Sequence, residues 1–388
     1  MKTKRTVAAL LAAIVSISAL CSCKGQSSAP SSTESEQGGI TANDDKEEIM
    51  ERFDELLSGM SAAVYAVYKG EEIYADGEGE AQPGTANSPD VAYGIASLTK
   101  QFTAAAVLQL YEEKKLDIND KLSRYFPDYA HGEEITVKQL LCQRSGIPDY
   151  EVNSYEGRII ITCEGSEKYA LISAENSAEN NIDIIRGFFL SCGLLFEPGE
   201  RFSYSDSNYG LLAAIIEKVS EESYHGYLRK HIFEPLGMNA AFIDDHDSMS
   251  AVTASGDLSE FGADYYSVKG AEFGCGDILA SPKELYKWYK GLFGGKVISA
   301  ESLKLMTENY SDTGELGYGF GLMIIEDKTP VYYHTGYIPS FYSTVIYLPE
   351  DDYFQAVLAN RGYGEPHSAA FELAHEFCSI TRIKTIYL

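Results

Sequence analysis

The chain has 388 residues, of which 45% are hydrophobic, and it carries a formal net charge of −27 at pH 7. This length exceeds the size at which single hydrophobic cores usually stop growing, so we expect two lobes around a substantial core. The strong negative charge argues against a nucleic-acid partner and against direct adhesion to anionic lipid or polymer. It does not exclude a locally positive pocket.

The first 23 residues are typical of an export signal. Lys2, Lys4 and Arg5 form a positively charged start, and 7–20 is an apolar stretch too short to cross a bilayer comfortably. Residues 1–23 are therefore excluded from the fold, and the remainder is expected to be exported.

The end of this signal resembles a bacterial lipobox. Leu20 and Ser22 stand at positions −3 and −1 relative to Cys23, which implies a lipoprotein anchored to the lipid bilayer by diacylglycerol on Cys23. Cys21 would have Leu20 at −1, a poorer fit. Residues 24–45 contain almost no large apolar side chain and predict a flexible tether. The alternative is an ordinary cleaved signal peptide; the lipobox and the tether together favour the lipoprotein.

The remaining domain, 46–388, contains helical and strand-like segments in a definite order. Hydrophobic periodicity and composition predict secondary structure in these segments. In chain order they are a helix over 44–57, a hairpin of strands 62–68 and 72–74, helices over 101–111, 137–141, 182–190, 209–219, 223–233 and 283–293, strands over 331–333, 341–348 and 353–360, and a helix over 367–381. Such an order suits a sheet built from both chain ends with an inserted helical lobe. A nucleophile at the lobe boundary would face a cleft, where sites usually lie.

Ser97 and Lys100 form the most informative pair in the chain. They belong to Ser-Leu-Thr-Lys, the only Ser-x-x-Lys in the sequence, directly before the helix over 101–111. Within a first helical turn the two side chains would share one face. A serine hydroxyl becomes nucleophilic when a base takes its proton, and a nearby lysine can do so once desolvation lowers its pKa. An isolated match would more often be an N-cap and a solvated surface charge.

The cysteines and histidines predict neither a metal site nor a cofactor. There is no Cys-x-x-Cys and no His-Glu-x-x-His, and five cysteines beyond the leader are scattered along the chain. We expect these to be small buried hydrophobic residues. They are Cys142, Cys163, Cys192, Cys275 and Cys378.

Two later segments, together with the tetrad that contains Ser97 and Lys100, make a set of three motifs. Tyr204 lies in a polar loop just before a helix, two residues ahead of Asp206, and His334-Thr335-Gly336 ends a strand. With Ser-x-x-Lys, these resemble the three motifs Ser-x-x-Lys, Tyr-x-Asn and Lys-Thr-Gly of the class C β-lactamase and penicillin-binding-protein superfamily. Five blocks, at 95–115, 140–150, 195–209, 232–238 and 334–341, look like family sequence in family order.

The resemblance implies a fold and a set of roles. The fold would be of the β-lactamase/transpeptidase-like α/β (α+β) class, a mostly antiparallel sheet flanked by helices with an inserted, mainly helical lobe. Ser97 would be the acylated nucleophile, Lys100 its proton partner and Tyr204 a proton shuttle. The backbone N–H groups of Ser97 and Tyr337 would form the oxyanion hole. His334, Thr335 and Gly336 would line the substrate strand.

Two positions depart from the family pattern. Asp206 replaces an asparagine, so a probable anion stands where an amide donor is usual, and it could stabilise a protonated Lys100. His334 replaces a lysine, and its ordinary pKa near 6.5 leaves it mostly neutral at pH 7. A fixed cation for a substrate carboxylate is thereby lost or made pH-dependent, which resembles esterase and peptidase branches more than efficient β-lactamases.

These observations predict a serine hydrolase without cofactor, acting through an acyl-enzyme on a small ester or a D-amino-acid-type peptide at the outer face of the cytoplasmic membrane. That location makes peptidoglycan a candidate partner. Two alternatives remain open at this point: a slow β-lactamase or penicillin-binding protein of the DD-carboxypeptidase kind, and a non-catalytic receptor for cell-wall fragments. The intact Ser97, Lys100 and Tyr204 count against the receptor.

Overall fold

The computed structural model describes residues 43–155, 158–248, 253–255, 268–312, 317–326, 329–361, 368–372 and 375. All of them belong to one compact unit, Ile40–Leu388. The predicted lipobox with Cys23, most of the tether, Cys378 and most of the last predicted helix lie outside the described residues. Among the described helices, none combines the length and the apolar character that a membrane span requires.

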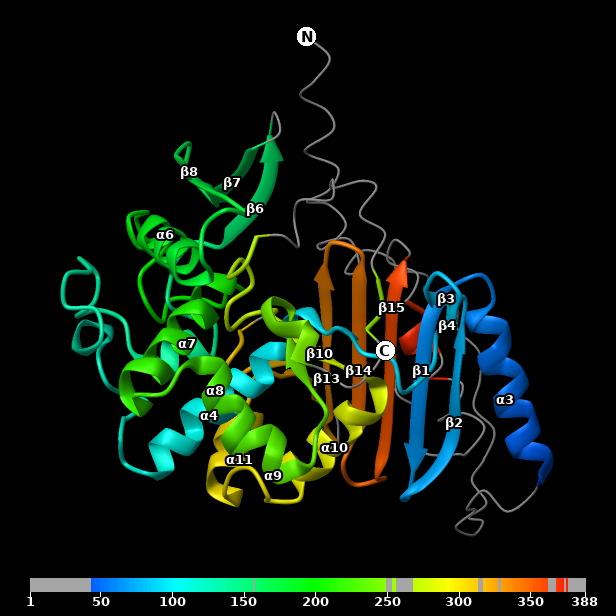
Figure 1. Cartoon of the computed structure of the whole chain (residues 1–388). Coiled ribbons are helices and arrows are strands. Elements are labelled where there is room, and N and C mark those ends of the chain that lie inside the picture. Colours follow the sequence, from blue (N-terminus) through cyan, green and yellow to red (C-terminus); the bar gives the residue numbers. More distant parts are fainter. Residues whose placement is uncertain are drawn as a thin grey trace, which may run out of the picture. The chain divides into compact units, whose positions relative to one another are not determined.

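A seven-stranded antiparallel sheet forms the centre of this unit (Figure 1). Its strands, in spatial order, are β11 (Gly317–Tyr318), β12 (Met323–Ile325), β13 (Val331–Ile338), β14 (Phe341–Leu348), β15 (Tyr353–Arg361), β1 (Ser61–Tyr68) and β2 (Glu71–Glu78). The first hairpin of the chain thus pairs with strands of its last third, which confirms the prediction of a sheet built from both ends.

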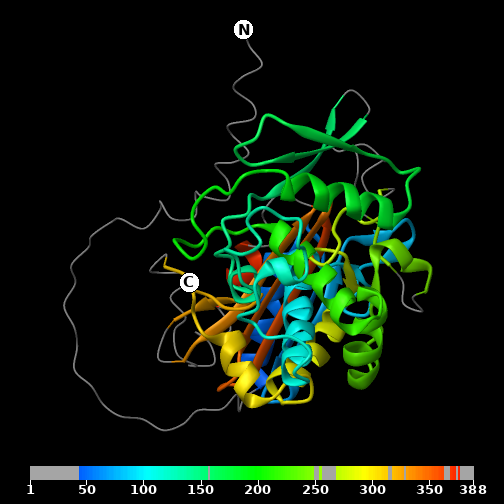
Figure 2. The same ribbon diagram turned by 90° about the vertical axis from the view of Figure 1, so that its left-hand side faces the viewer.

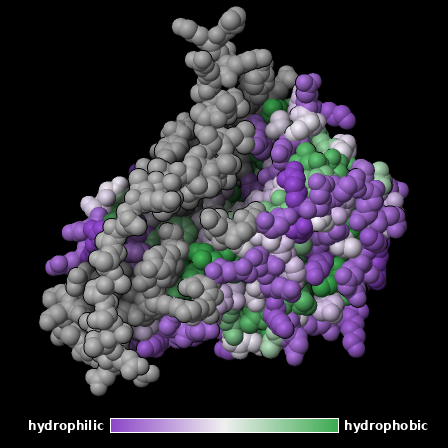
Figure 3. All heavy atoms as spheres, turned by 180° about the vertical axis from the view of Figure 1, so that it is seen from behind, coloured by the Kyte–Doolittle hydropathy of each residue, from purple (hydrophilic) through white to green (hydrophobic). Residues whose placement is uncertain are grey.

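The two faces of the sheet pack against different helices. On one face, Phe53 of α3 (Asn43–Leu57) lies against Tyr74, with ring centroids 4.8 Å apart. On the other, Tyr289 of α10 (Pro282–Phe293) packs against Tyr347 and Phe354. The central strand β14 is buried along its whole length because both faces are covered. Where it is coloured, the face in Figure 3 is mostly hydrophilic, as the acidic composition requires.

The inserted lobe is mainly helical and lies beside α4 (Thr99–Glu112) (Figures 1 and 2), a helix that is buried nearly all round. Its helices, together with those that connect it to the sheet, are α4 (Thr99–Glu112), α5 (Val137–Leu141), α6 (Ala178–Leu190), α7 (Asp206–Ser220), α8 (Tyr224–Leu228), α9 (Glu234–Leu236) and α11 (Ala300–Thr307). The helix predicted over 223–233 is interrupted, since a π-helical turn occupies Arg229–Phe233. The other predicted helices among the described residues are confirmed, with small differences at their ends.

Three small sheets among the described residues were not predicted, and one of them is the two-stranded pair of β3 (Glu80–Gln82) and β4 (Thr85–Ala86). Strands β6 (Tyr150–Tyr155), β7 (Arg158–Cys163) and β8 (Tyr169–Ile172) project from the lobe, and their short runs lack a clear alternation. A third sheet joins β5 (Tyr93–Gly94), β10 (Ile278–Ala280) and β9 (Ala241–Phe242). This third sheet matters for function, because it brings the segment before β10 beside the turn that carries Ser97.

Candidate active site

Ser97 lies in a buried turn where the lobe meets the sheet. The turn is a single 3-10 helix, Ala96–Leu98, that continues into α4. Ala96 has a positive φ of 49°, a conformation that costs a non-glycine residue about 1 kcal/mol or more and persists only when its surroundings hold it. One such restraint is the hydrogen bond that the Ile95 N–H donates to the Ile278 carbonyl, at 3.0 Å. Ser97 itself is half-buried.

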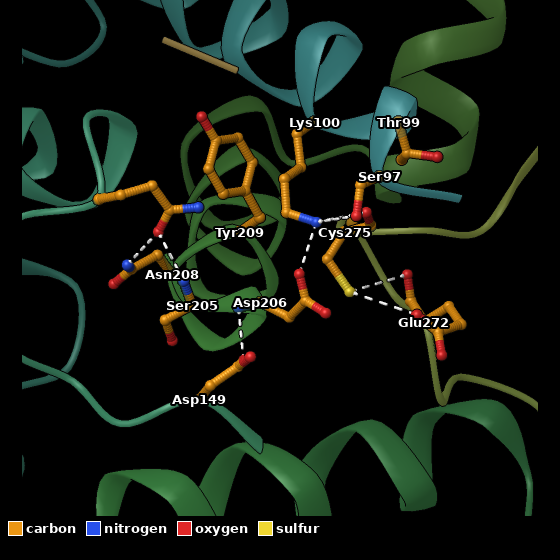
Figure 4. Close-up of polar contacts among 12 residues, drawn as sticks. Ser97, Thr99, Lys100, Asp149, Ser205, Asp206, Asn208, Tyr209, Glu272 and Cys275 are labelled. Atoms are coloured by element: carbon orange, nitrogen blue, oxygen red, sulfur yellow. Dashed lines mark hydrogen bonds and ion pairs between the residues drawn. The ribbon is translucent and has the colours of Figure 1, made fainter. Parts of the chain in front are cut away.

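Lys100 is the centre of the site, and its side chain is 0% exposed. Its ammonium nitrogen lies 3.0 Å from Ser97 Oγ, 2.9 Å from the Cys275 carbonyl oxygen and 2.5 Å from Asp206 Oδ1 (Figure 4). It also lies 4.9 Å from the centre of the Tyr204 ring. The structure therefore brings four of the predicted site residues together around one nitrogen.

The charge state of Lys100 differs from the one expected of a desolvated base. Burial alone would lower the pKa of Lys100, but the Asp206 carboxylate outweighs it, and the pKa is raised well above its ordinary value. Lys100 is thus an ammonium in the resting site and donates its hydrogen bond to Ser97 Oγ. The expectation that desolvation lowers this pKa is wrong here, because an aspartate stands where the family has asparagine.

Asp149 is a site residue that the sequence argument missed. Its Oδ1 accepts a hydrogen bond of 2.7 Å from the Asp206 N–H at the start of α7. Burial and the neighbouring Asp206 carboxylate raise the pKa of Asp149 well above its usual range, which favours the neutral carboxyl group. In the sequence, the one indication that Asp149 belongs to the site was its position in the 140–150 block, directly after Ile147-Pro148.

Tyr204 faces Lys100 from the loop before α7. Its hydroxyl is buried and makes no hydrogen bond of standard geometry within the described part of the chain. Tyr318 packs edge-on against it, with ring centroids 5.9 Å apart. Burial raises the pKa of Tyr204 well above its ordinary value, although the Lys100 ammonium opposes the shift. Tyr204 is therefore a neutral phenol that can donate a proton.

His334 is 0% exposed and neutral. Its Nδ1 lies 2.6 Å from the Thr335 carbonyl oxygen, which can only accept, so the proton is on Nδ1. Nε2 has no hydrogen-bond partner among the residues that the structure describes. Burial, followed by the Lys100 charge, lowers the pKa of His334 to about 3. The expected loss of a cation at this position is thus complete at neutral pH rather than pH-dependent.

The edge of β13 that follows His334 lies against the Ser97 turn. A Cβ added to Gly336 would stand 2.6 Å from the Ile95 carbonyl oxygen and 2.4 Å from Ser343 Oγ, so only glycine fits there. In the described residues β12 pairs with β13 only as far as Tyr333, whereas β14 pairs with it to Ile338. The strand edge beyond Tyr333 is therefore positioned beside the nucleophile without a second strand on it.

Thr335 and Tyr337 lie on this same segment, on the face opposite to His334 and Gly336. Thr335 is half-buried, while the Tyr337 side chain is 46% exposed and packs against Tyr342, with ring centroids 5.0 Å apart. The backbone of Thr335 and Tyr337, rather than their side chains, therefore lies at the site. The oxyanion hole from the Ser97 and Tyr337 N–H groups stays a prediction.

A loop ending in Phe273-Gly274-Cys275-Gly276 forms the remaining side of the site. Gly274 has a φ of +76°, and a Cβ there would stand 2.4 Å from the Ala213 Cβ. This close approach to α7 aims the Cys275 carbonyl at Lys100. Sequence reasoning missed both Cys275 and Glu272, and the glycines flanking the cysteine were the available signal.

Asp206, Glu272 and Cys275 each offer one atom within 4.8 Å of the others, a spacing at which a metal ion could bind. A thiol binds metal as the thiolate. Burial and the two carboxylates raise the pKa of Cys275 well above its ordinary value, and Lys100 already pairs with Asp206. The chemistry of these three groups is thus unfavourable for a metal. The prediction that cysteines are small buried residues is confirmed for Cys142, Cys163, Cys192 and Cys275, which are all free thiols.

Comparison with known proteins agrees with this geometry. The family model described as Beta-lactamase matches residues 49–378. The chain belongs to the beta-lactamase family. PbpX of Bacillus subtilis (strain 168) is 32% identical over 289 residues, which are 73% of this chain and 66% of PbpX. The chain therefore spans just under two thirds of PbpX, and 53% of Protein flp from Staphylococcus aureus (strain MW2).

Solved structures show the same fold. The octameric penicillin-binding protein homologue from Pyrococcus abyssi superposes with a TM-score of 0.69 at 28% identity, covering 88% of this chain and 78% of that one. The D-amino acid amidase from Ochrobactrum anthropi SV3, complexed with L-phenylalanine amide, also has a TM-score of 0.69, at 21% identity, covering 88% and 99%. The predicted β-lactamase/transpeptidase-like fold is confirmed.

Proposed function

We propose that the chain is a membrane-anchored, extracytoplasmic hydrolase that forms an acyl-enzyme on Ser97 with an ester or a D-amino-acid-type peptide. The observation that carries the proposal is the contact of the Lys100 nitrogen with both Ser97 Oγ and Asp206 Oδ1, at 3.0 and 2.5 Å. A solvated surface lysine would show neither the burial nor the shared contacts.

The proposed first step uses Asp206 as the final proton acceptor. As an ammonium, Lys100 cannot accept the Ser97 proton unless it gives one up. As Ser97 Oγ attacks the substrate carbonyl carbon, its proton passes to Lys100, and another Lys100 proton passes to Asp206 Oδ1. Lys100 remains cationic throughout, and the negative charge moves from Asp206 to the tetrahedral oxyanion. The Ser97 and Tyr337 N–H groups would bind that oxyanion.

Collapse of the tetrahedral state then requires a proton on the leaving group. The Tyr204 hydroxyl, which has no competing hydrogen bond of standard geometry among the described residues, donates it and is reprotonated from Asp206 through Lys100. The Ser97 proton thus ends on the leaving group, and the acyl-enzyme forms. Water enters by the reverse path and releases the acid.

The choice of substrate class rests on charge. A β-lactam carries a carboxylate that a fixed cation would bind, and His334 supplies none at neutral pH. Neutral esters and peptides need no such cation. Two structural neighbours, a penicillin-binding protein homologue and a D-amino acid amidase, support substrates of the D-amino-acid type.

Anchoring through Cys23 and proximity to peptidoglycan complete the proposal. The support is the order of export signal, lipobox and tether in 1–45. Metabolic labelling with palmitate tests it in the bacterium. Label is expected on wild type and on Cys21→Ala but not on Cys23→Ala; label that persists in Cys23→Ala contradicts the anchor.

The enzymatic proposal is tested on the purified full chain beside its Ser97→Ala variant. Each is mixed with an activated short-chain ester, a C-terminally amidated peptide ending in D-Ala-D-Ala, and a penicillin, and protein and product masses are followed. Wild type is expected to cleave the ester or the peptide, with an acyl adduct on Ser97, and Ser97→Ala to cleave neither. Equal turnover by the variant would overturn the mechanism, and a stable penicilloyl adduct would move the chain to the penicillin-recognising enzymes.

A further inference from the structure

Gln143 accepts hydrogen bonds from both residues that flank Tyr204. Its backbone carbonyl oxygen accepts from the Ser203 N–H at 2.9 Å, and its side-chain Oε1 accepts from the Ser205 N–H at 3.1 Å. Gln143 is fully buried, and the side chain of Ser205, the residue directly before α7, makes no capping hydrogen bond. The backbone on each side of Tyr204 is therefore tied to one glutamine.

Gln143 ends α5 in a left-handed conformation, with a φ of +59°. Its N–H donates to the Leu140 carbonyl at 3.2 Å, and the Arg144 N–H donates to the Gln139 carbonyl at 2.8 Å, which is the pattern of a Schellman motif. Glycine makes such a turn without strain, whereas glutamine does not. What glutamine adds over glycine at this position is the side-chain oxygen at the start of α7.

Buried partners fix the orientation of the Gln143 amide. Asn208 Nδ2 donates to Gln143 Oε1 at 2.6 Å, and Asn208 Oδ1 accepts from the Ser145 hydroxyl, also at 2.6 Å. Ser205 and Asn208 lie together at the start of α7 in Figure 4. Because the Ser205 N–H can only donate, the atom of Gln143 that faces it is the oxygen, and the group of Asn208 that faces this oxygen is the NH₂.

The position of the Tyr204 hydroxyl depends on this backbone. Within the described part of the chain the hydroxyl makes no hydrogen bond of standard geometry. The Tyr204 ring packs against Tyr318 and His334, with ring centroids 5.9 and 6.3 Å away. A general acid works only within hydrogen-bond reach of the atom that it protonates. A shift of about 1 Å in this loop would therefore slow proton transfer by about 10²-fold.

We propose that Gln143 is a positioning residue for Tyr204, and that its two acceptor oxygens hold the Tyr204 hydroxyl where a departing group takes its proton. This inference rests on the proposed function, in which Tyr204 protonates the leaving group as its bond to the acyl carbon breaks. Attack by Ser97 uses Lys100 and Asp206 in that mechanism. Loss of the Gln143 oxygen should therefore impair departure of the leaving group without impairing attack.

Two kinds of substrate separate these steps in the full chain. p-Nitrophenyl butyrate releases a stable phenolate that needs no proton. The leaving group of ethyl butyrate, or of the amidated D-Ala-D-Ala peptide if that is the better substrate, must be protonated. Gln143→Met keeps the side-chain length and the backbone carbonyl but removes Oε1. We expect kcat/KM for the second kind of substrate to fall about 10- to 100-fold, and that for p-nitrophenyl butyrate to change less than about threefold.

Further variants distinguish positioning of Tyr204 from general support of the fold. Tyr204→Phe should lose more on the second kind of substrate than Gln143→Met does. Adding Gln143→Met to Tyr204→Phe should cost nothing further, because Gln143 acts through Tyr204. Gln143→Asn tolerates the left-handed turn and withdraws the oxygen by one methylene, so it should show an intermediate loss. It takes over the test if Gln143→Met does not fold.

Gln355→Met is the matched control. Gln355 is a buried glutamine of β15 whose Nε2 donates to the Ala370 carbonyl at 2.8 Å. Its substitution removes buried hydrogen bonds outside the site, so the ratio of the two kcat/KM values should equal that of wild type. This ratio does not depend on how much of a variant is folded.

The outcomes separate the inference from the proposed function. A wild-type ratio in the Gln143 variants, an equal loss on both kinds of substrate, or an additive loss in the double variant overturns the inference. A wild-type ratio in Tyr204→Phe refutes the role of Tyr204 itself. The proposed function fails if wild type hydrolyses none of these substrates and forms no acyl adduct on Ser97.

Discussion

The helical side of the site and its strand side are stabilised by different interactions. The helical side, Ser97, Lys100 and Asp206, is charged and held by an ion pair of 2.5 Å. The strand side, His334–Tyr337 of β13, is neutral at pH 7 and held by close packing at Gly336. In the proposed mechanism, proton transfer belongs to the helical side, whereas the strand side supplies a backbone edge and no charged side chain.

The two departures from the family pattern change the charge around Ser97 in the same direction. Asp206 adds an anion to the helical side, and His334 removes a cation from the strand side. Each alone would alter one contact, but together they make the environment of Ser97 more negative. On the proposed function, a substrate carboxylate is therefore disfavoured for both reasons.

The largest expected effect is on the helical side, at Lys100. Lys100→Met should reduce kcat at least about 10³-fold, because the relay loses its centre. It should also destabilise the fold by about 3 kcal/mol, since Asp206 is left without its partner. Steady-state kinetics and urea unfolding measure the two effects. In the double variant with Asp206→Asn, stability should recover and activity should not; recovery of neither stability nor activity would contradict the ion-pair account.

Gly336→Ala tests the strand side by adding a methyl group without changing any charge. The added methyl group would stand 2.6 Å from the Ile95 carbonyl and push the strand away from the Ser97 turn. We expect a loss of about 10- to 100-fold in kcat/KM and of about 1–3 kcal/mol in stability. Gly187→Ala is the control, because nothing lies within 4 Å of a Cβ there. Equal behaviour of the two variants would refute the close approach.

Asp206→Asn restores the family residue and tests the proton relay by pH. Without the carboxylate, burial dominates and lowers the pKa of Lys100, which then becomes a base only above its new value. The acid limb of kcat/KM should move to higher pH, with a loss of about tenfold at pH 6 and little loss at pH 9. An unchanged acid limb, measured with a neutral ester, would remove Asp206 from the relay.

The smallest effect on activity is expected from substitution of His334. Its main effect should be on how the free energy of unfolding depends on pH. His334 is neutral in the fold down to about pH 3 but protonates in the unfolded chain near pH 6.5. The unfolded state therefore binds more protons between these values, and stability falls as the pH drops, by about 1.4 kcal/mol per unit from this group. His334→Gln should flatten that slope in urea titrations from pH 7 to 4. An identical slope would show that His334 is accessible to protons.

Much of the fold and of the candidate site could be predicted from the sequence, and the features that could not have physical causes. Segments such as 137–141 and 341–348 match their predicted bounds, because local composition and burial agree there. The strands 158–163 and 169–172 were missed although they pair with each other as neighbours in the chain, because their short runs lack a clear alternation of apolar and polar residues. Ser97, Lys100 and Tyr204 stood out through their motifs.

The charge states could not be predicted in the same way. The sequence left open whether Lys100 is a desolvated base or a protonated partner of Asp206, and only the structure shows that Asp206 lies 2.5 Å away and outweighs the effect of burial. Asp149 and Glu272 carry no motif of their own. They belong to the site because loops fold them next to Asp206, which spacing in the chain does not encode.

The central claim is that Ser97 is the nucleophile and that Lys100 with Asp206 activates it. The most direct measurement is the mass of the full chain, and of its peptides, after reaction with a fluorophosphonate that modifies activated serines. We predict one adduct per chain, on the peptide that contains Ser97, formed far more slowly in Lys100→Met and not at all in Ser97→Ala. An adduct on another serine, or equal modification of Ser97→Ala, would contradict the account.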